Sequence, residues 1–232
     1  MSSSPASDAS RAAIFARIRA ARQARDSLHA QERAAAQAWI GQPAPGPRPH
    51  IAAHDLLPRF CQQAQKMSDS LVLLDAPEQI PAAVADFLRR HSLPPALPLW
   101  PQFAALDWAA AGVQAQVRAA QADDACALTG SYCAVAECGS LLLLSSAEQA
   151  LKNAILPPNH IAVLQQSRIV PDMEAAFALL RAEGRSLPRS AMFISGPSRT
   201  GDIEQTIVLG AHGPQRVHVL LLRSPAEDAE LP

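Results

Sequence analysis

Short apolar runs alternate with helical segments from residue 50 to residue 223. The runs that we predict to be strands lie at 71–74, 96–100, 126–128, 141–145, 161–165, 167–170, 191–194 and 217–222. Apolar positions at helical spacing predict helices over 54–67, 81–91 and 171–183. Strands separated by helices of this length are typical of βαβ units. We therefore predict an α/β fold with a mainly parallel sheet flanked by helices.

Two segments within this domain give weaker patterns. Residues 113–118 alternate between apolar and polar side chains, which predicts an edge or antiparallel strand. Residues 132–136 are interpreted as a short helix that leads into a turn at 137–140 and then into the next strand. The turn would then be a helix-to-strand corner of the parallel sheet.

The segment 200–210 is also ambiguous. We favour a helix, with Thr200 as its N-cap and Gly210 just after its last turn. The competing interpretation is a strand, because residues 206–208 are β-branched.

Composition changes sharply along the first fifty residues. Residues 1–40 are predicted as a helical extension, rich in Ala, Arg and Gln, which either docks a partner or a second copy or folds back on its own domain. The proline-rich residues 41–49 form a semi-rigid linker, because proline fixes φ and ends helices. The α/β domain then covers 50–223, and 224–232 form an acidic tail.

Composition and charge exclude several classes of partner. With 49% hydrophobic residues in 232, the chain can bury one substantial core. A net charge of −1 offers no field that would recruit nucleic acid or a membrane surface. No secretory leader and no apolar run long enough to span a membrane are found in the sequence, so we expect a cytoplasmic protein.

The cysteines argue against a metal site held by this chain. Cys61, Cys126, Cys133 and Cys138 include no Cys-x-x-Cys pair, so we expect neither a zinc site nor an iron–sulfur cluster here. Buried free thiols are favoured over a redox pair of Cys133 with Cys138.

The densest chemistry lies between residues 194 and 222. A loop rich in Ser and Gly that opens onto a helix N-terminus presents backbone N–H groups and a positive dipole to an anion. The residues assigned to this anion site are Ser195, Gly196, Ser198, Arg199, Thr200 and Asp202. The alternative is an ordinary capped turn with a solvated arginine.

Two residues are candidates for catalysis. Glu137 precedes Gly139 at the predicted corner, where a carboxylate serves as a general base, a nucleophile or a ligand for a substrate hydroxyl. His212 lies in a Gly/Pro turn, where an imidazole lines a cleft or binds a carboxylate. These side chains meet the anion loop only if both loops end at the same edge of the sheet. The alternative for Glu137 is a surface residue that caps a turn.

Two blocks of sequence carry a resemblance to a known family. Residues 195–214, SGPSRTGDIEQTIVLGAHGP, and 129–143, TGSYCAVAECGSLLL, are similar to the signatures of the LUD-domain family. Cys138 stands where the family usually has Thr. The similarity covers roughly residues 50 to 223. It implies a fold like that of sugar-phosphate isomerases and coenzyme-A transferases.

The resemblance also implies a function. It suggests a component of the bacterial iron–sulfur system that oxidises L-lactate to pyruvate, acting with two partner subunits that hold the clusters. Arg199 and Arg216 would then be candidates to bind a carboxylate such as lactate. Two alternatives stay open. One is a free-standing isomerase-like or acyl-transferase-like enzyme that uses Glu137 on a phosphorylated or CoA-linked substrate, and the other is a module that senses lactate through residues 195–200. Whether this chain is itself an enzyme is left open by the sequence.

Overall fold

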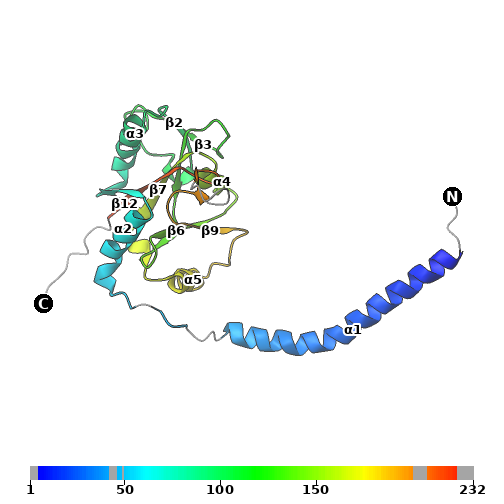
Figure 1. Ribbon diagram of the computed structural model, residues 1–232. Helices are drawn as coiled ribbons and strands as arrows, with labels where there is room; N and C mark the ends of the chain where they lie inside the picture. The colour runs from blue at the N-terminus through cyan, green and yellow to red at the C-terminus, as the bar shows by residue number, and fades with distance from the viewer. Residues whose placement is uncertain (1–4, 42–45, 49, 201–207, 224–232) are drawn as a thin grey trace. The chain divides into compact units, whose positions relative to one another are not determined.

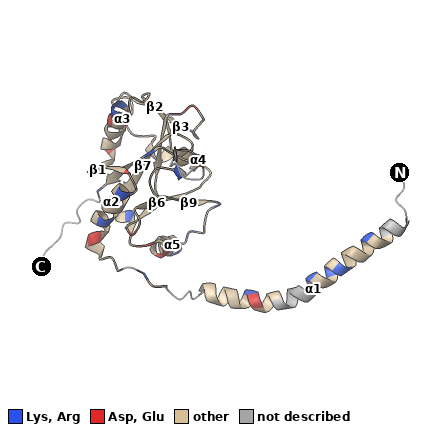
Figure 2. Ribbon diagram, in the orientation of Figure 1, with Lys and Arg blue, Asp and Glu red and all other residues tan. Residues whose placement is uncertain are grey.

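The computed structural model describes residues 5–41, 46–48, 50–200 and 208–223. The chain divides into two units, residues 1–48 and 49–232, and each is described by itself. The first unit contains one helix, α1 (Pro5–Gly41). Six arginines and three acidic residues lie in this helix, so basic residues predominate along it (Figure 2).

The apolar side chains of α1 that the structure describes do not form a buried face. The exposed large side chains are Ile14, Phe15, Ile18, Trp39 and Ile40, with 46 to 69% of each residue accessible to solvent. The segment forms one continuous helix from Pro5 to Gly41. Among the described residues, no helix has the length and apolar character required to cross a membrane.

The second unit is built on a six-stranded sheet in which every pairing is parallel (Figure 1). Across the sheet the strands are β1 (Ser70–Leu74), β12 (Arg216–Leu222), β7 (Asn159–Gln165), β4 (Cys126–Gly130), β2 (Ala96–Leu99) and β3 (Gln114–Val117). The central strands β4 and β7 are almost wholly buried, as expected for parallel strands covered on both faces. The predicted edge strand is confirmed as β3, and it runs parallel to its neighbour.

Helices and 3-10 turns connect these strands. The helices are α2 (Leu56–Lys66), α3 (Ile80–Arg90) and α4 (Lys152–Ile155). The 3-10 turns are η1 (Ala53–Asp55), η2 (Pro77–Gln79), η3 (Pro101–Phe103) and η4 (Gln166–Arg168). Phe87 of α3 stacks on His218 of β12 with ring centroids 4.8 Å apart, so α3 covers the face of the sheet that His218 occupies.

A second, mixed sheet packs beside the first. It has the order β8 (Ile169–Val170), β5 (Cys133–Val135), β6 (Ser140–Leu144) and β9 (Ala191–Ile194). Helix α2 contacts both β1 and β8, and β5 contacts β7, so the small sheet lies against the parallel sheet. Helix α5 (Met173–Ala182) covers the outer side of the small sheet (Figure 1).

The alternation of side chains along the small sheet explains this layering. Cys133, Val135 and Leu142 pack with Ala176 and Leu180 of α5. The intervening residues Ala134, Leu141, Leu143 and Ile194 belong to the larger core shared with the parallel sheet. Because successive strand residues face opposite sides, each strand contributes to two apolar layers. The predicted α/β class with a mainly parallel sheet flanked by helices is confirmed.

One predicted helix is wrong. Within residues 132–136, Cys133–Val135 form strand β5, because the run is buried on both sides and pairs with β6, and a short apolar run shows no period that separates strand from helix. Most of the helix predicted over 200–210 lies outside the described residues. The described ends of that segment form an antiparallel pair, β10 (Arg199–Thr200) with β11 (Val208–Leu209). Helix α4 was not predicted.

Candidate functional site

The order of the strands creates a topological switch point between β2 and β4. From β2 the main sheet continues to β3 on one side, whereas from β4 it continues to β7 and β12 on the other. Where the connections of two adjacent parallel strands diverge, a crevice opens beyond their carboxyl ends, and α/β proteins bind ligands there. The residues that follow β2 and β4 are therefore the first candidates for a ligand site.

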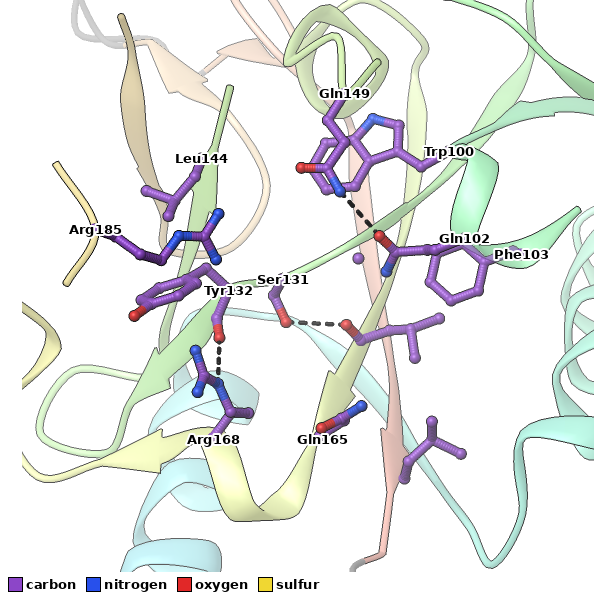
Figure 3. Close-up of a pocket in the computed structure, with 13 residues that line it drawn as sticks. Trp100, Gln102, Phe103, Ser131, Tyr132, Leu144, Gln149, Gln165, Arg168 and Arg185 are labelled. Atoms are coloured by element: carbon purple, nitrogen blue, oxygen red, sulfur yellow. Dashed lines mark hydrogen bonds between the residues drawn. The ribbon is translucent and has the colours of Figure 1, made fainter. Parts of the chain in front are cut away.

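A cavity of about 270 Å³ lies at this point, and we call it the switch-point pocket (Figure 3). Its walls come from the ends of four parallel strands, from the loops after them, from the end of β6 and the loop after it, and from the residues after α5. Its polar lining consists of Gln102, Ser131, Tyr132, Gln149, Gln165, Arg168 and Arg185. The apolar lining includes Trp100, Phe103, Leu144 and Leu222.

One wall of the pocket is cationic. Tyr132 lies between two guanidinium groups, with Arg168 at 4.5 Å and Arg185 at 5.3 Å from its ring centroid. Arg168 also forms an ion pair with Glu183, and its Nε donates to the Tyr132 carbonyl oxygen at 2.9 Å. Two guanidinium groups beside one carboxylate leave a net positive charge at this wall.

The same contacts shift the pKa values of Glu183 and Tyr132. Hydrogen bonds from Arg168 and from Tyr132, whose hydroxyl donates to Glu183 at 2.8 Å, hold the pKa of the Glu183 carboxyl below its ordinary value. Burial, followed by the neighbouring Glu183 carboxylate, raises the pKa of the Tyr132 phenol. Tyr132 therefore stays protonated at neutral pH.

The end of α5 fixes the position of Arg185. Gly184 has a φ of 64° and its N–H donates to the Arg181 carbonyl, while the Arg185 N–H donates to the Leu180 carbonyl, each at 3.0 Å. This pair of hydrogen bonds is a Schellman motif, which ends a helix with a left-handed glycine. Arg185 thus leaves the helix in a defined direction.

The opposite wall is uncharged. Gln149 Nε2 donates to Gln102 Oε1 at 3.0 Å, and Ser131 Oγ donates to the Val163 carbonyl at 2.9 Å (Figure 3). A Cβ atom at Gly130 would lie 2.4 Å from the Gln102 amide nitrogen, so glycine lets this side chain lie over the strand end. The wall offers amide and hydroxyl groups that orient a polar ligand.

This arrangement suits the binding of a small anion more than acid–base chemistry. Among the described residues that line the pocket, none carries a carboxylate, imidazole or thiol group. The guanidinium group of Arg185 suits a carboxylate or phosphate oxygen pair, and the amides suit a hydroxyl or carbonyl group. The pocket therefore has the chemistry of a binding site for a small hydroxy or oxo acid.

The sequence-predicted site residues lie elsewhere. Glu137 follows β5 in the turn to β6, so it lies at a strand-to-strand turn of the small sheet and not at a helix-to-strand corner of the parallel sheet. Its backbone N–H donates to the Pro171 carbonyl at 3.0 Å. Its carboxylate has no hydrogen-bond or ion-pair partner within the described part of the chain.

The Ser195 loop packs against the same turn. Ser195 Oγ lies 2.5 Å from Ser140 Oγ, which in turn lies 2.9 Å from Cys138 Sγ. A Cβ atom at Gly196 would lie 2.3 Å from the Met67 carbonyl oxygen, at the end of α2. The two signature blocks therefore meet, as a close packing of turns on the end of α2.

The rest of the predicted anion loop forms a β-ribbon. Arg199 Nη2 donates to Ser68 Oγ at 2.6 Å, and the His212 N–H donates to Ser198 Oγ at 3.4 Å. The backbone of Thr200 pairs with Val208. Asp202 lies outside the described residues. Ser198, Arg199 and His212 are thus brought together, and none of the predicted site residues that the structure describes lines the switch-point pocket.

The four cysteines are free thiols. Burial raises the pKa of Cys126 and of Cys133 to about 12, so both are protonated at neutral pH. In the described part of the chain, no group of three or more His, Cys, Asp or Glu side chains is placed to hold a metal ion.

The ends of the predicted strands are the one sequence signal that points to residues of this pocket. Each wall begins where a predicted strand ends: Gln102 after β2, Ser131 after β4 and Arg168 after β7. The sequence predicted those strands but not their order across the sheet, and it is the order that brings the three loops together.

The fold and the cavity define an α/β protein with a polar pocket at the switch point of a parallel sheet. The model of the LUD domain family matches residues 59–222. The chain therefore belongs to this family, and the resemblance seen in the two signature blocks is confirmed.

Curated relatives carry names that refer to lactate. The chain is 34% identical over 129 residues to the lactate utilization protein C of Bacillus licheniformis, covering 53% of each chain. It is 36% identical over 98 residues to the protein of that name from Bacillus subtilis, covering 41% of each. The matches thus span about half, or less, of the length of these relatives.

A crystal structure of a DUF162 family protein from Deinococcus radiodurans shares the fold. It has a TM-score of 0.53 and 20% sequence identity, and the match covers 75% of this chain and 99% of the other. This likeness supports the assignment of the fold alone.

Proposed function

We propose that this chain binds a small carboxylate of the lactate and pyruvate type in the switch-point pocket, as a component of bacterial lactate utilisation. The observation that carries the proposal is the cationic wall made by Arg168, Tyr132 and Arg185, opposite the amides of Gln102 and Gln149. We choose lactate and pyruvate as the ligands because relatives of this chain are named for lactate utilisation.

The pocket favours a binding role over a free-standing catalytic one. A carboxylate pairs with Arg185, and the hydroxyl or oxo group of the ligand contacts the amide wall. Oxidation of L-lactate to pyruvate removes two electrons and two protons, and the residues of the lining supply no group that accepts them. We propose that partner subunits hold the iron–sulfur clusters that take up these electrons.

The thiols support a proposal for the compartment. Four free cysteines, two of them fully enclosed, suit a reducing compartment, and we place the protein in the cytoplasm.

Titration calorimetry with L-lactate and pyruvate tests the proposal. Arg185→Gln is a better test than a variant at Arg168. Arg168 also binds Glu183 and the Tyr132 carbonyl, so the loss of Arg168 would change the structure of the cationic wall. Removing one charge-assisted contact should weaken binding by about tenfold or more.

Arg181→Gln is the matched control, since Arg181 is an exposed arginine of α5 that does not line the pocket. Its affinity for lactate should equal that of the unchanged protein. Absence of saturable heat from either acid, or equal weakening in both variants, would refute the proposed site.

A further inference from the structure

A second cavity lies at the other edge of the parallel sheet, where β1 and β12 begin. It has a volume of about 420 Å³, within the range of about 300–1,000 Å³ typical of small-ligand sites. We call it the arginine pocket, after the residues that define it. They include Ser68, Ser70, Arg90, His91, Arg199 and Arg216.

The positive charge of this pocket is poorly compensated. Arg199 donates to Ser68 Oγ at 2.6 Å, and Arg216 donates to Asn159 Oδ1 at 3.2 Å, so both interact with uncharged acceptors. Arg90 pairs with Asp86 at 2.7 Å, but the same carboxylate also binds Arg89. Three guanidinium groups therefore face one cavity, and among the residues that the structure describes, the single carboxylate paired with them, Asp86, is shared with Arg89.

The imidazole beside these groups is neutral. Burial, and then the charges of Arg216 and Arg90, lower the pKa of His91. This ring therefore adds hydrogen-bonding capacity to the pocket without adding charge at neutral pH.

Two serine hydroxyls complete the polar lining. Ser70 is exposed, and its Oγ lies 2.8 Å from Nδ1 of His218, whose ring is buried against Phe87. Nε2 of His218 has no partner among the described residues, so the serine contact is the polar anchor of this ring. Ser68 has a φ of 76°, a left-handed conformation that places its hydroxyl against Arg199.

We propose that the arginine pocket binds the phosphate group of a small phosphorylated molecule. A carboxylate carries one negative charge on two oxygens, whereas a phosphate dianion carries two charges on more oxygens and so matches several guanidinium groups and hydroxyls better. The site is separate from the switch-point pocket and goes beyond the function proposed above, since it accommodates a second, differently charged ligand at the opposite end of β12.

Titration of inorganic phosphate into the full chain tests this site. Arg216→Gln and Arg199→Gln should each weaken phosphate binding by about tenfold or more, because each removes a charge-assisted contact. Arg181→Gln is the matched control, since Arg181 is an exposed arginine of α5 that lines neither pocket. It should change the affinity less than twofold.

Arg185→Gln separates the two pockets. Phosphate affinity should be unchanged in this variant, while lactate affinity falls. Arg216→Lys keeps the charge and should recover most of the phosphate affinity lost in Arg216→Gln, which excludes a folding defect as the cause.

Three results would overturn the proposal: no saturable phosphate binding by the unchanged protein, an equal loss in Arg181→Gln, or a loss in Arg185→Gln alone. The last result would place phosphate in the switch-point pocket. Lactate titrations on the same samples report on the proposed function independently, so failure of one proposal is distinguishable from failure of the other.

Discussion

The carboxyl group of Asp69 is enclosed between the end of α2 and the start of β1, with 6% of the residue exposed. Neither of its oxygens has a hydrogen-bond partner among the described residues. Burial raises the pKa of this carboxyl from 3.8 to about 7. Ionisation at neutral pH therefore acts against the folded state, and the side chain destabilises the domain that surrounds it.

The direction of the pH dependence follows from proton counting. Between about pH 4 and pH 7 the folded state binds the Asp69 proton more tightly than the unfolded state, so the free energy of unfolding falls as pH rises. The penalty is absent below pH 4 and complete above pH 7. At about 1.36 kcal/mol per pKa unit, a shift of about three units is worth about 4 kcal/mol.

Asp69→Asn removes the titrating group and keeps the shape. We expect a higher free energy of unfolding than that of the unchanged protein at pH 8 and a smaller difference, or none, at pH 4. Urea unfolding at both pH values measures the difference. An Asn variant that is less stable at pH 8 would show that the carboxylate has a stabilising partner.

At the scale of elements, left-handed glycines decide how turns pack. Gly184 and Gly139 have φ values of 64° and 73°, but their surroundings differ. A Cβ atom at Gly184 would meet nothing within 4 Å, whereas one at Gly139 would lie 2.4 Å from the backbone nitrogen of Ala64. Comparing an alanine substitution at each position therefore separates two contributions to the free energy of unfolding: the left-handed backbone conformation and steric crowding.

Alanine at each position should therefore have a different effect. Gly184→Ala should cost only the left-handed conformation, about 1–2 kcal/mol. Gly139→Ala should cost this amount plus about 1–3 kcal/mol of overpacking against α2. Chemical denaturation of both variants measures the difference, and equal losses would mean that the 137–140 turn does not press on α2.

The individual strands and helices also show which parts of the fold the sequence can and cannot predict. Strands such as β6 and β12 and helix α5 were predicted because long apolar runs with a clear period leave one interpretation. In the structure, the Asp172 side chain caps α5 by accepting from the Ala175 N–H at 2.7 Å. The segment 133–135 was misassigned because three buried residues show no period. Of the segment 200–210, only the ends are described, and Thr200 and Val208 pair as strand residues there.

At the scale of the whole molecule, the site depends on strand order. Arg168 and Arg185 lie 17 positions apart and Gln102 lies more than 60 positions before them, yet all three line one pocket. Neither composition nor spacing in the sequence indicates this convergence. The signature blocks instead drew attention to Glu137 and residues 195–200, which the fold packs around the end of α2.

Mapping of L-lactate by backbone NMR on the full chain tests the central claim most directly. If the switch-point pocket is the carboxylate site, the amide signals that shift should belong to residues 130–132, 165–168 and 184–185. Shifts confined to residues 137–140, 195–199 and 212 would contradict the account and would return the ligand to the loops that the sequence first suggested.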